Sequence, residues 1–162
     1  MEKKVLILGA GMVSPPLVRF LIEQQGIRVT VADAAGERAR TLVAGSPRGT
    51  ALTLDFEDTS GVIGQIGEAH LFISLLPFNY HPHVAELCVQ TRTDLITASY
   101  TSPEMHGLEE KIDRAGILVL NEIGLDPGID HMEAIRIIQD VEARGGRIRS
   151  FLSYCGGLPA PE

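Results

Sequence analysis

The sequence predicts an α/β fold in which a doubly wound parallel sheet of about six strands is covered by helices on both faces. Three observations predict it: apolar strands alternate with amphipathic helices, the strands are unbroken runs of branched aliphatics, and the first strand stops at a glycine turn before a helix. Unbroken apolar strands are typical of parallel sheets buried on both faces, and β-α alternation implies right-handed crossovers. We expect this Rossmann-type domain over residues 1–126, followed over 127–162 by the truncated start of a second domain.

The composition restricts the class of ligand. Of the 162 residues, 44% are hydrophobic and 22% are charged, which suffices for one well-packed domain. A net charge of -7 without a basic run argues against nucleic acid and anionic membranes as partners, so a small molecule is expected. No signal-like region precedes the first strand and no apolar run reaches membrane-spanning length, which predicts a cytoplasmic protein. Cys88 and Cys155 are expected to be reduced.

The glycine turn after the first strand has the features of a dinucleotide-binding loop. Gly9 can adopt the tight turn, and Gly11 allows a pyrophosphate to approach the main chain. Ser14 replaces the third glycine of the usual pattern, and the two prolines after it fit the first turn of a helix, whose start carries roughly half a positive charge. The alternative is an ordinary strand-turn-helix of another α/β protein, because short glycine motifs recur by chance.

Asp33 ends the second strand about 20 residues beyond the glycines, where a carboxylate can accept hydrogen bonds from an adenosine ribose. Its charge would repel a 2′-phosphate and therefore favours NAD over NADP. The alternative is that Asp33 caps the following helix. Ala34 comes next, so the nearest candidates for a phosphate-binding cation are Arg38 and Arg40 on that helix.

The remaining elements follow from the apolar periodicity. We expect strands over 28–33, 49–55, 69–77, 94–100 and 117–122, and helices over 13–25, 37–44, 60–66, 82–91, 103–115 and 132–144. The ligand crevice of an open α/β sheet lies at the carboxyl ends of its strands. Asp55 and Phe56 would therefore flank an adenine pocket, and Ser99 and Tyr100 would face the crevice.

Two histidines, His81 and His83, begin one of the predicted helices. Imidazoles two residues apart do not face one another on a helix, and no Cys, Asp or Glu completes a ligand set nearby. We therefore expect no metal and interpret both as surface or capping histidines.

The segment Gly124–His131 follows the last predicted strand at the ligand edge. Asp126 before Pro127 has the pattern of a helix N-cap, and Asp130 and His131 could be buried hydrogen-bonding residues. The alternative is that this cluster, beside a nucleotide crevice, holds a substrate amine or carboxylate. Residues 147–154 are interpreted as a strand, and a Gly/Pro loop follows.

Five blocks at matching order and spacing resemble saccharopine dehydrogenase of the glutamate-forming type: Ile73–Pro77, Thr97–Tyr100, Asn121–Gly124, Gly124–His131 and Ser150–Glu162. The resemblance covers essentially the whole chain. It implies oxidation of saccharopine by a nicotinamide cofactor to an imine, whose hydrolysis gives glutamate and 2-aminoadipate 6-semialdehyde in lysine metabolism. It also implies that a larger substrate and dimerisation region follows this domain, and that the complete protein is a homodimer.

The resemblance implies roles for particular residues. The pyrophosphate would lie along Gly11, Met12 and Val13. The adenosine half would contact Asp33, Asp55, Phe56 and Leu76, and the nicotinamide side Ala98 and Leu125. The amino-acid substrate would contact Ser99, Tyr100 and Asp126. Asp126 would anchor the substrate amine with help from Tyr100 or water, and Cys155 would at most line the site.

One position departs from the family pattern. Fungal members have an arginine for the 2′-phosphate where this chain has Ala34, so the NAD-using animal members are the better guide and NADP is the second choice. Two other functions stay open. One is a related imine-reducing dehydrogenase such as carboxynorspermidine dehydrogenase, and the other is a non-catalytic NAD(H)-binding module.

Overall fold

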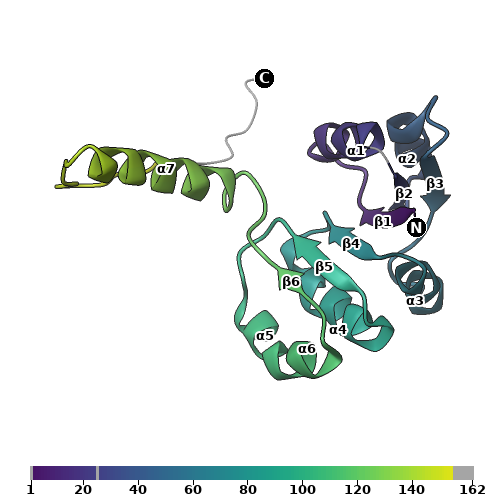
Figure 1. The fold of residues 1–162 in the computed structure, drawn as a ribbon. Helices are drawn as coiled ribbons and strands as arrows, with labels where there is room; N and C mark the ends of the chain where they lie inside the picture. Colours follow the sequence, from purple (N-terminus) through teal and green to yellow (C-terminus); the bar gives the residue numbers. More distant parts are fainter. Residues whose placement is uncertain (1, 25, 155–162) are drawn as a thin grey trace, which may run out of the picture.

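The computed structural model describes residues 2–24 and 26–154. Its sheet has six strands in the order β3-β2-β1-β4-β5-β6, and neighbouring strands pair in parallel (Figure 1). The strands are β1 Lys3–Leu8, β2 Ile27–Asp33, β3 Gly49–Thr53, β4 Leu71–Ser74, β5 Asp94–Thr97 and β6 Val119–Leu120. The predicted doubly wound Rossmann-type sheet is confirmed, although four of the strands are shorter than expected.

The helices alternate with the strands as predicted. They are α1 Ser14–Glu23, α2 Gly36–Val43, α3 Thr59–Gly67, α4 His81–Thr91, α5 Pro103–His106, α6 Glu109–Ala115 and α7 Ile129–Ala143, with the short 3₁₀ turn η1 Phe78–Tyr80 before α4. The single helix expected over 103–115 is divided into α5 and α6. Both Met105 and Leu108 are buried, and the Leu108 N–H donates to the Met105 carbonyl, three residues back, at 3.0 Å, which tightens the chain at that point.

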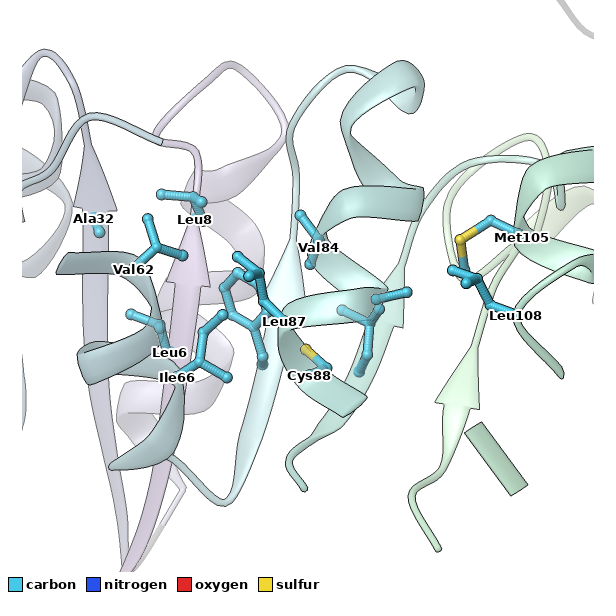
Figure 2. Close-up of a cluster of buried hydrophobic side chains, with 13 residues drawn as sticks. Leu6, Leu8, Ala32, Val62, Ile66, Val84, Leu87, Cys88, Met105 and Leu108 are labelled. Carbon is cyan, nitrogen blue, oxygen red and sulfur yellow. The ribbon is translucent and has the colours of Figure 1, made fainter. Parts of the chain in front are cut away.

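Alternate residues of β1 enter two separate cores, because successive side chains of a strand point to opposite faces. Val5 and Ile7 pack with residues of α1 and α2. Leu6 and Leu8 pack on the other face with residues of α3 and α4 (Figure 2). With β2 on one side and β4 on the other, β1 holds its carboxyl end at the point where the strand order reverses, which is where α/β sheets bind ligands.

The chain beyond β6 differs most from expectation. Helix α7 begins at Ile129 and has no buried residue, and it extends away from the sheet (Figure 1). The strand predicted over 147–154 is wrong: these residues are exposed and irregular, and no described strand lies beside them to share ladder hydrogen bonds. The predicted Gly/Pro loop and Cys155 fall outside the described residues. None of the described helices has the length and apolar character needed to span a membrane.

Candidate functional site at the carboxyl edge of the sheet

The glycine loop between β1 and α1 is tied down by hydrogen bonds. Gly9 has a φ of 108°, and its N–H donates to the Ala32 carbonyl at 2.9 Å. A Cβ added at this position would lie 3.0 Å from the Leu75 carbonyl oxygen, so glycine is required on both counts. The hydroxyl of Ser14, which is buried, donates to the Gly9 carbonyl at 2.8 Å. The residue that replaces the third glycine therefore holds the turn in place.

The outer part of this loop fits a phosphate group. A Cβ added at Gly11 would meet no atom within 4 Å, and Met12 and Val13 are 97% and 65% exposed. The Ser14 N–H already donates to the Gly11 carbonyl, and Pro15 and Pro16 have no N–H. The main-chain N–H groups of residues 11–13 make no hydrogen bond within the described part of the chain. They are the donors that this helix start can offer to a pyrophosphate.

Asp33 links the glycine loop to the turn after β2. One carboxylate oxygen accepts the Ala10 N–H at 2.7 Å, and the other accepts the Ala35 N–H at 2.8 Å. Asp33 is not the N-cap of α2 as the alternative had it, because that position is Ala35, whose own side chain makes no capping hydrogen bond. Each carboxylate oxygen keeps a second lone pair for a ribose hydroxyl.

A pocket of about 300 Å³ lies next to the glycine loop. It brings together five residues that the sequence assigned to the cofactor: Gly9, Asp33, Asp55, Phe56 and Leu76. Sequence reasoning missed Tyr80, which also lines this pocket and meets the Phe56 ring edge-on at 5.5 Å. The signal for it was an aromatic residue soon after Pro77, where the chain leaves β4.

A second pocket, of about 350 Å³, lies farther along the same edge. Its lining includes four predicted residues, Ala98, Ser99, Tyr100 and Asp126. The Tyr100 hydroxyl donates to a carboxylate oxygen of Asp126 at 2.5 Å. Leu125, by contrast, is 69% exposed and is not among the residues that line this pocket.

Tyr100 and Asp126 meet because the chain continues side by side beyond the ends of β5 and β6. The Ile123 N–H donates to the Thr97 carbonyl and the Glu122 N–H to the Ser99 carbonyl, both at 3.0 Å. The next turn is closed by a hydrogen bond from the Gly124 N–H to the Pro127 carbonyl at 2.8 Å.

The predicted N-cap role of Asp126 is wrong. Helix α7 starts only at Ile129, and its N-cap is Gly128, with a φ of 145° that favours glycine. The Asp126 carboxylate therefore faces Tyr100. Asp130 and His131 interact with one another at 2.8 Å, and His131 is exposed, so it is not the buried hydrogen-bonding residue that the sequence suggested.

The surroundings of Tyr100 favour its protonated form. The hydrogen bond to Asp126 raises the pKa of the Tyr100 phenol to about 12, with further contributions from partial burial and from the negative charges of Asp126, Asp130 and Glu122. The phenol is therefore a hydrogen-bond donor at neutral pH, and the Asp126 carboxylate is the acceptor.

His81 is not a surface histidine as expected. It begins α4 between the ends of β4 and β5, and only 3% of it is exposed. Its ring nitrogens contact two serine hydroxyls: Nδ1 lies 3.2 Å from Ser74 and Nε2 lies 2.9 Å from Ser99. Burial lowers the pKa of the His81 imidazole. The missed signal was a serine near the end of each of two neighbouring apolar strands, which parallel pairing brings to one edge.

His83 is exposed, as expected, and meets the Phe56 ring edge-on. Within the described ranges, no group of three or more His, Cys, Asp or Glu side chains is arranged to hold a metal ion.

The strand order, the glycine loop at the end of the central strand and the two pockets along one edge define a Rossmann-type nucleotide-binding domain. Residues 5–120 match the family model of the saccharopine dehydrogenase NADP binding domain, and residues 124–162 match that of the saccharopine dehydrogenase C-terminal domain. The chain belongs to the saccharopine dehydrogenase family, as the sequence blocks indicated.

Curated relatives and a solved structure agree with this assignment. The chain is 46% identical to saccharopine dehydrogenase [NADP(+), L-glutamate-forming] of Saccharomyces cerevisiae, over 100% of this chain and 36% of the relative. It is 40% identical to mitochondrial alpha-aminoadipic semialdehyde synthase of Mus musculus, over 99% of this chain and 17% of the relative. The apo structure of the Saccharomyces cerevisiae enzyme, L-Glu forming, superimposes with a TM-score of 0.85 at 45% identity, covering 98% of this chain and 36% of that chain. The chain thus spans about a third of the length of its fungal relatives.

Proposed function

We propose that the complete protein is an oxidoreductase of lysine metabolism that oxidises saccharopine to glutamate and 2-aminoadipate 6-semialdehyde. The observation that carries the proposal is the Tyr100–Asp126 pair in a pocket on the same sheet edge as the glycine loop. Membership of the saccharopine dehydrogenase family and the glutamate-forming yeast relative support it.

The residues of this chain would bind and orient the two reactants. The nicotinamide, when bound, accepts a hydride from the substrate carbon next to the secondary amine. The N–H groups of residues 11–13 would hold the pyrophosphate. The pocket at Asp33 and Phe56 would hold the adenosine. At the second pocket, Ala98 would lie on the nicotinamide side, while Ser99, Tyr100 and Asp126 would contact the substrate.

Asp126 is the proposed anchor for the substrate amine and the acceptor of its proton. A carboxylate attracts the substrate amine. The hydrogen bond from the Tyr100 hydroxyl fixes the orientation of the Asp126 carboxylate. Tyr100 itself is poorly suited as a base, because its pKa is raised to about 12. Loss of the amine proton and the hydride gives an imine, and addition of water to the imine releases glutamate and the semialdehyde.

For the cofactor, we propose NADP with weak discrimination against NAD. The names of the family model and of the fungal relatives specify NADP. Asp33 and Ala34, which line the adenosine pocket, favour NAD, because one is negative and the other offers no cation to a 2′-phosphate. Ratios of kcat/KM for NADP and NAD within about tenfold are expected, which is a difference of about 1.4 kcal/mol. A strong preference for NAD would overturn the assignment to NADP. It would indicate that the negative charge of Asp33 excludes the 2′-phosphate.

The first experiment measures formation of reduced nicotinamide by the full-length protein with saccharopine and either NAD or NADP. Turnover supports the proposal. Turnover of a carboxynorspermidine substrate alone would replace it with the related imine-reducing dehydrogenase. Cofactor binding without turnover of either substrate would replace it with a non-catalytic nucleotide-binding module.

Two further properties of the complete protein are also proposals. We propose a homodimer, which sedimentation equilibrium of the full-length protein tests, and a monomer would contradict it. We also propose a cytoplasmic location, and the contrary result would be co-localisation of a tagged full-length protein with an organelle. The proposed partners of the complete protein are its small-molecule reactants and a second copy of the chain, without nucleic acid or a membrane.

A further inference from the structure

The buried serine at the end of β4 fixes the protonation of His81. Ser74 is fully buried, and its hydroxyl has one hydrogen-bond partner among the described residues, the Nδ1 of His81. A buried hydroxyl that donates to nothing is costly, so the Ser74 hydroxyl donates and Nδ1 accepts. Because burial keeps the imidazole neutral, its single proton then resides on Nε2.

The proton on Nε2 determines how Ser99 faces the pocket. Nε2 lies 2.9 Å from the Ser99 oxygen and donates to it. The Ser99 hydroxyl proton has no acceptor among the described residues, and Ser99 lines the second pocket. It is therefore left to donate into that pocket, where a ligand with an acceptor oxygen can receive it.

Two sides of the second pocket therefore differ in charge and in hydrogen-bonding character. Asp126 presents a carboxylate that Tyr100 already contacts, and this side suits an ammonium group. Ser99 presents a hydroxyl donor, and this side suits a carboxylate. An α-amino acid carries both groups on one carbon atom.

We propose that His81 is a positioning residue that orients the Ser99 hydroxyl as a donor, and so selects a carboxylate of the amino-acid substrate at that side of the pocket. This inference rests on the proposed function, because it assumes that an amino acid occupies the pocket. Nothing in it requires His81 to touch the substrate.

Two substitutions of His81 separate this role from a structural one. The amide of asparagine reaches the position of Nδ1, so His81→Asn keeps the contact with Ser74 and loses that with Ser99. The amide of glutamine reaches the position of Nε2, so His81→Gln keeps the contact with Ser99. His106→Asn, at an exposed histidine of α5 outside both pockets, is the control.

The experiment measures steady-state kinetics of the full-length variants with saccharopine. We expect His81→Asn to raise KM for saccharopine about five- to tenfold, the size of one lost hydrogen bond, with little change in KM for the cofactor. His81→Gln and His106→Asn should stay within about twofold of wild type. Adding His81→Asn to Ser99→Ala should cause no further loss, because His81 acts through Ser99. Equal effects of the asparagine and glutamine variants, or an unchanged KM in His81→Asn, would overturn the proposal.

A second readout does not depend on turnover. Nitrogen-15 NMR of the full-length protein should show His81 as a neutral imidazole protonated at Nε2. Protonation at Nδ1, or exchange between the two neutral forms, would overturn the proposal. If wild type fails to oxidise saccharopine while this tautomer is found, the proposed function fails and the orientation of Ser99 as a donor stands.

Discussion

At the scale of single residues, the hydrogen bond between Tyr100 and Asp126 assigns a different chemistry to each partner. Asp126 is half-buried and accepts a hydrogen bond from the phenol hydroxyl of Tyr100, which is 60% exposed. A carboxylate in this position can bind an ammonium group and take its proton, whereas an uncharged amide binds ammonium more weakly and cannot take the proton.

Replacement of Asp126 by asparagine should therefore lower kcat/KM for saccharopine by about 100-fold or more, the range of general acid-base contributions. The dissociation constant of the cofactor should stay unchanged, because Asp126 does not line the pocket at Asp33 and Phe56 where the adenosine is proposed to bind. Kinetics and cofactor titration by fluorescence measure the two effects. Asp113→Asn, at an exposed carboxylate of α6, is the matched control. A loss of less than about tenfold would contradict the role of Asp126.

Tyr100 should make the stability of the fold depend on alkaline pH. Its pKa rises from 10.0 to about 12 on folding, so the folded state favours the protonated phenol. This contribution is fully present below pH 10 and is lost as the pH rises through about 12. Urea unfolding at several pH values should show a smaller fall across this window in Tyr100→Phe than in wild type or in Tyr154→Phe, an exposed tyrosine. Identical pH profiles for all three proteins would contradict the shift.

At the scale of elements, the two glycines of the loop between β1 and α1 differ in backbone conformation and surroundings. Gly9 has a positive φ and lies against the Leu75 carbonyl, whereas Gly11 faces open space. The first glycine is needed to form the turn, and the second is proposed to let a pyrophosphate approach the main chain.

Alanine at each position should separate these two requirements. Gly9→Ala should lower the free energy of unfolding by about 1–3 kcal/mol, because it combines a strained φ with a tight contact. Gly11→Ala should leave that free energy within about 0.5 kcal/mol of wild type but weaken cofactor binding. Urea unfolding and cofactor titration check both. Unimpaired cofactor binding in Gly11→Ala would show that the pyrophosphate lies elsewhere.

The elements that could be predicted from sequence are those whose pattern is set by local burial. Leu6 and Leu8 belong to one core, and Val5 and Ile7 belong to the other. Because this strand is buried on both faces, its sequence is an unbroken apolar run, and this run predicts the strand. The roles that were missed depend on contacts between distant elements. The capping pattern at Asp126 was plausible locally, but its carboxylate is engaged by Tyr100 instead. His81 gave no local sign of burial, because Ser74 and Ser99 meet it only in the folded sheet.

At the scale of the whole molecule, the chain divides into a packed sheet and a helix that buries nothing against it. Within the described residues, the buried hydrophobic core ends at Leu108, and α7 has no buried residue. The division into domains at residue 126 stays a prediction, and the exposed apolar residues of α7, Ile129, Met132, Ile135 and Ile137, are consistent with a partner surface for that helix.

Amide hydrogen exchange of this chain tests the division. The amides of β1, β2 and β4, in the middle of the sheet, should exchange most slowly, and those of α7 should exchange far sooner, because local stability follows buried contacts. Mass spectrometry of peptic peptides gives the comparison. Protection of α7 equal to that of β1 would show that the helix is part of the same cooperative unit.

The position of α7 also has a mechanical consequence. The helix leaves the sheet through a short turn that begins at Gly124, and one residue of that turn, Asp126, is bonded to Tyr100 in the second pocket. With 15 residues, α7 is about 22 Å long, so a tilt of about 5° at its base displaces its far end by roughly 2 Å. Any ligand that competes with Tyr100 for the Asp126 carboxylate therefore acts at the base of α7, a few residues before the exposed apolar side chains of Ile129 and Met132.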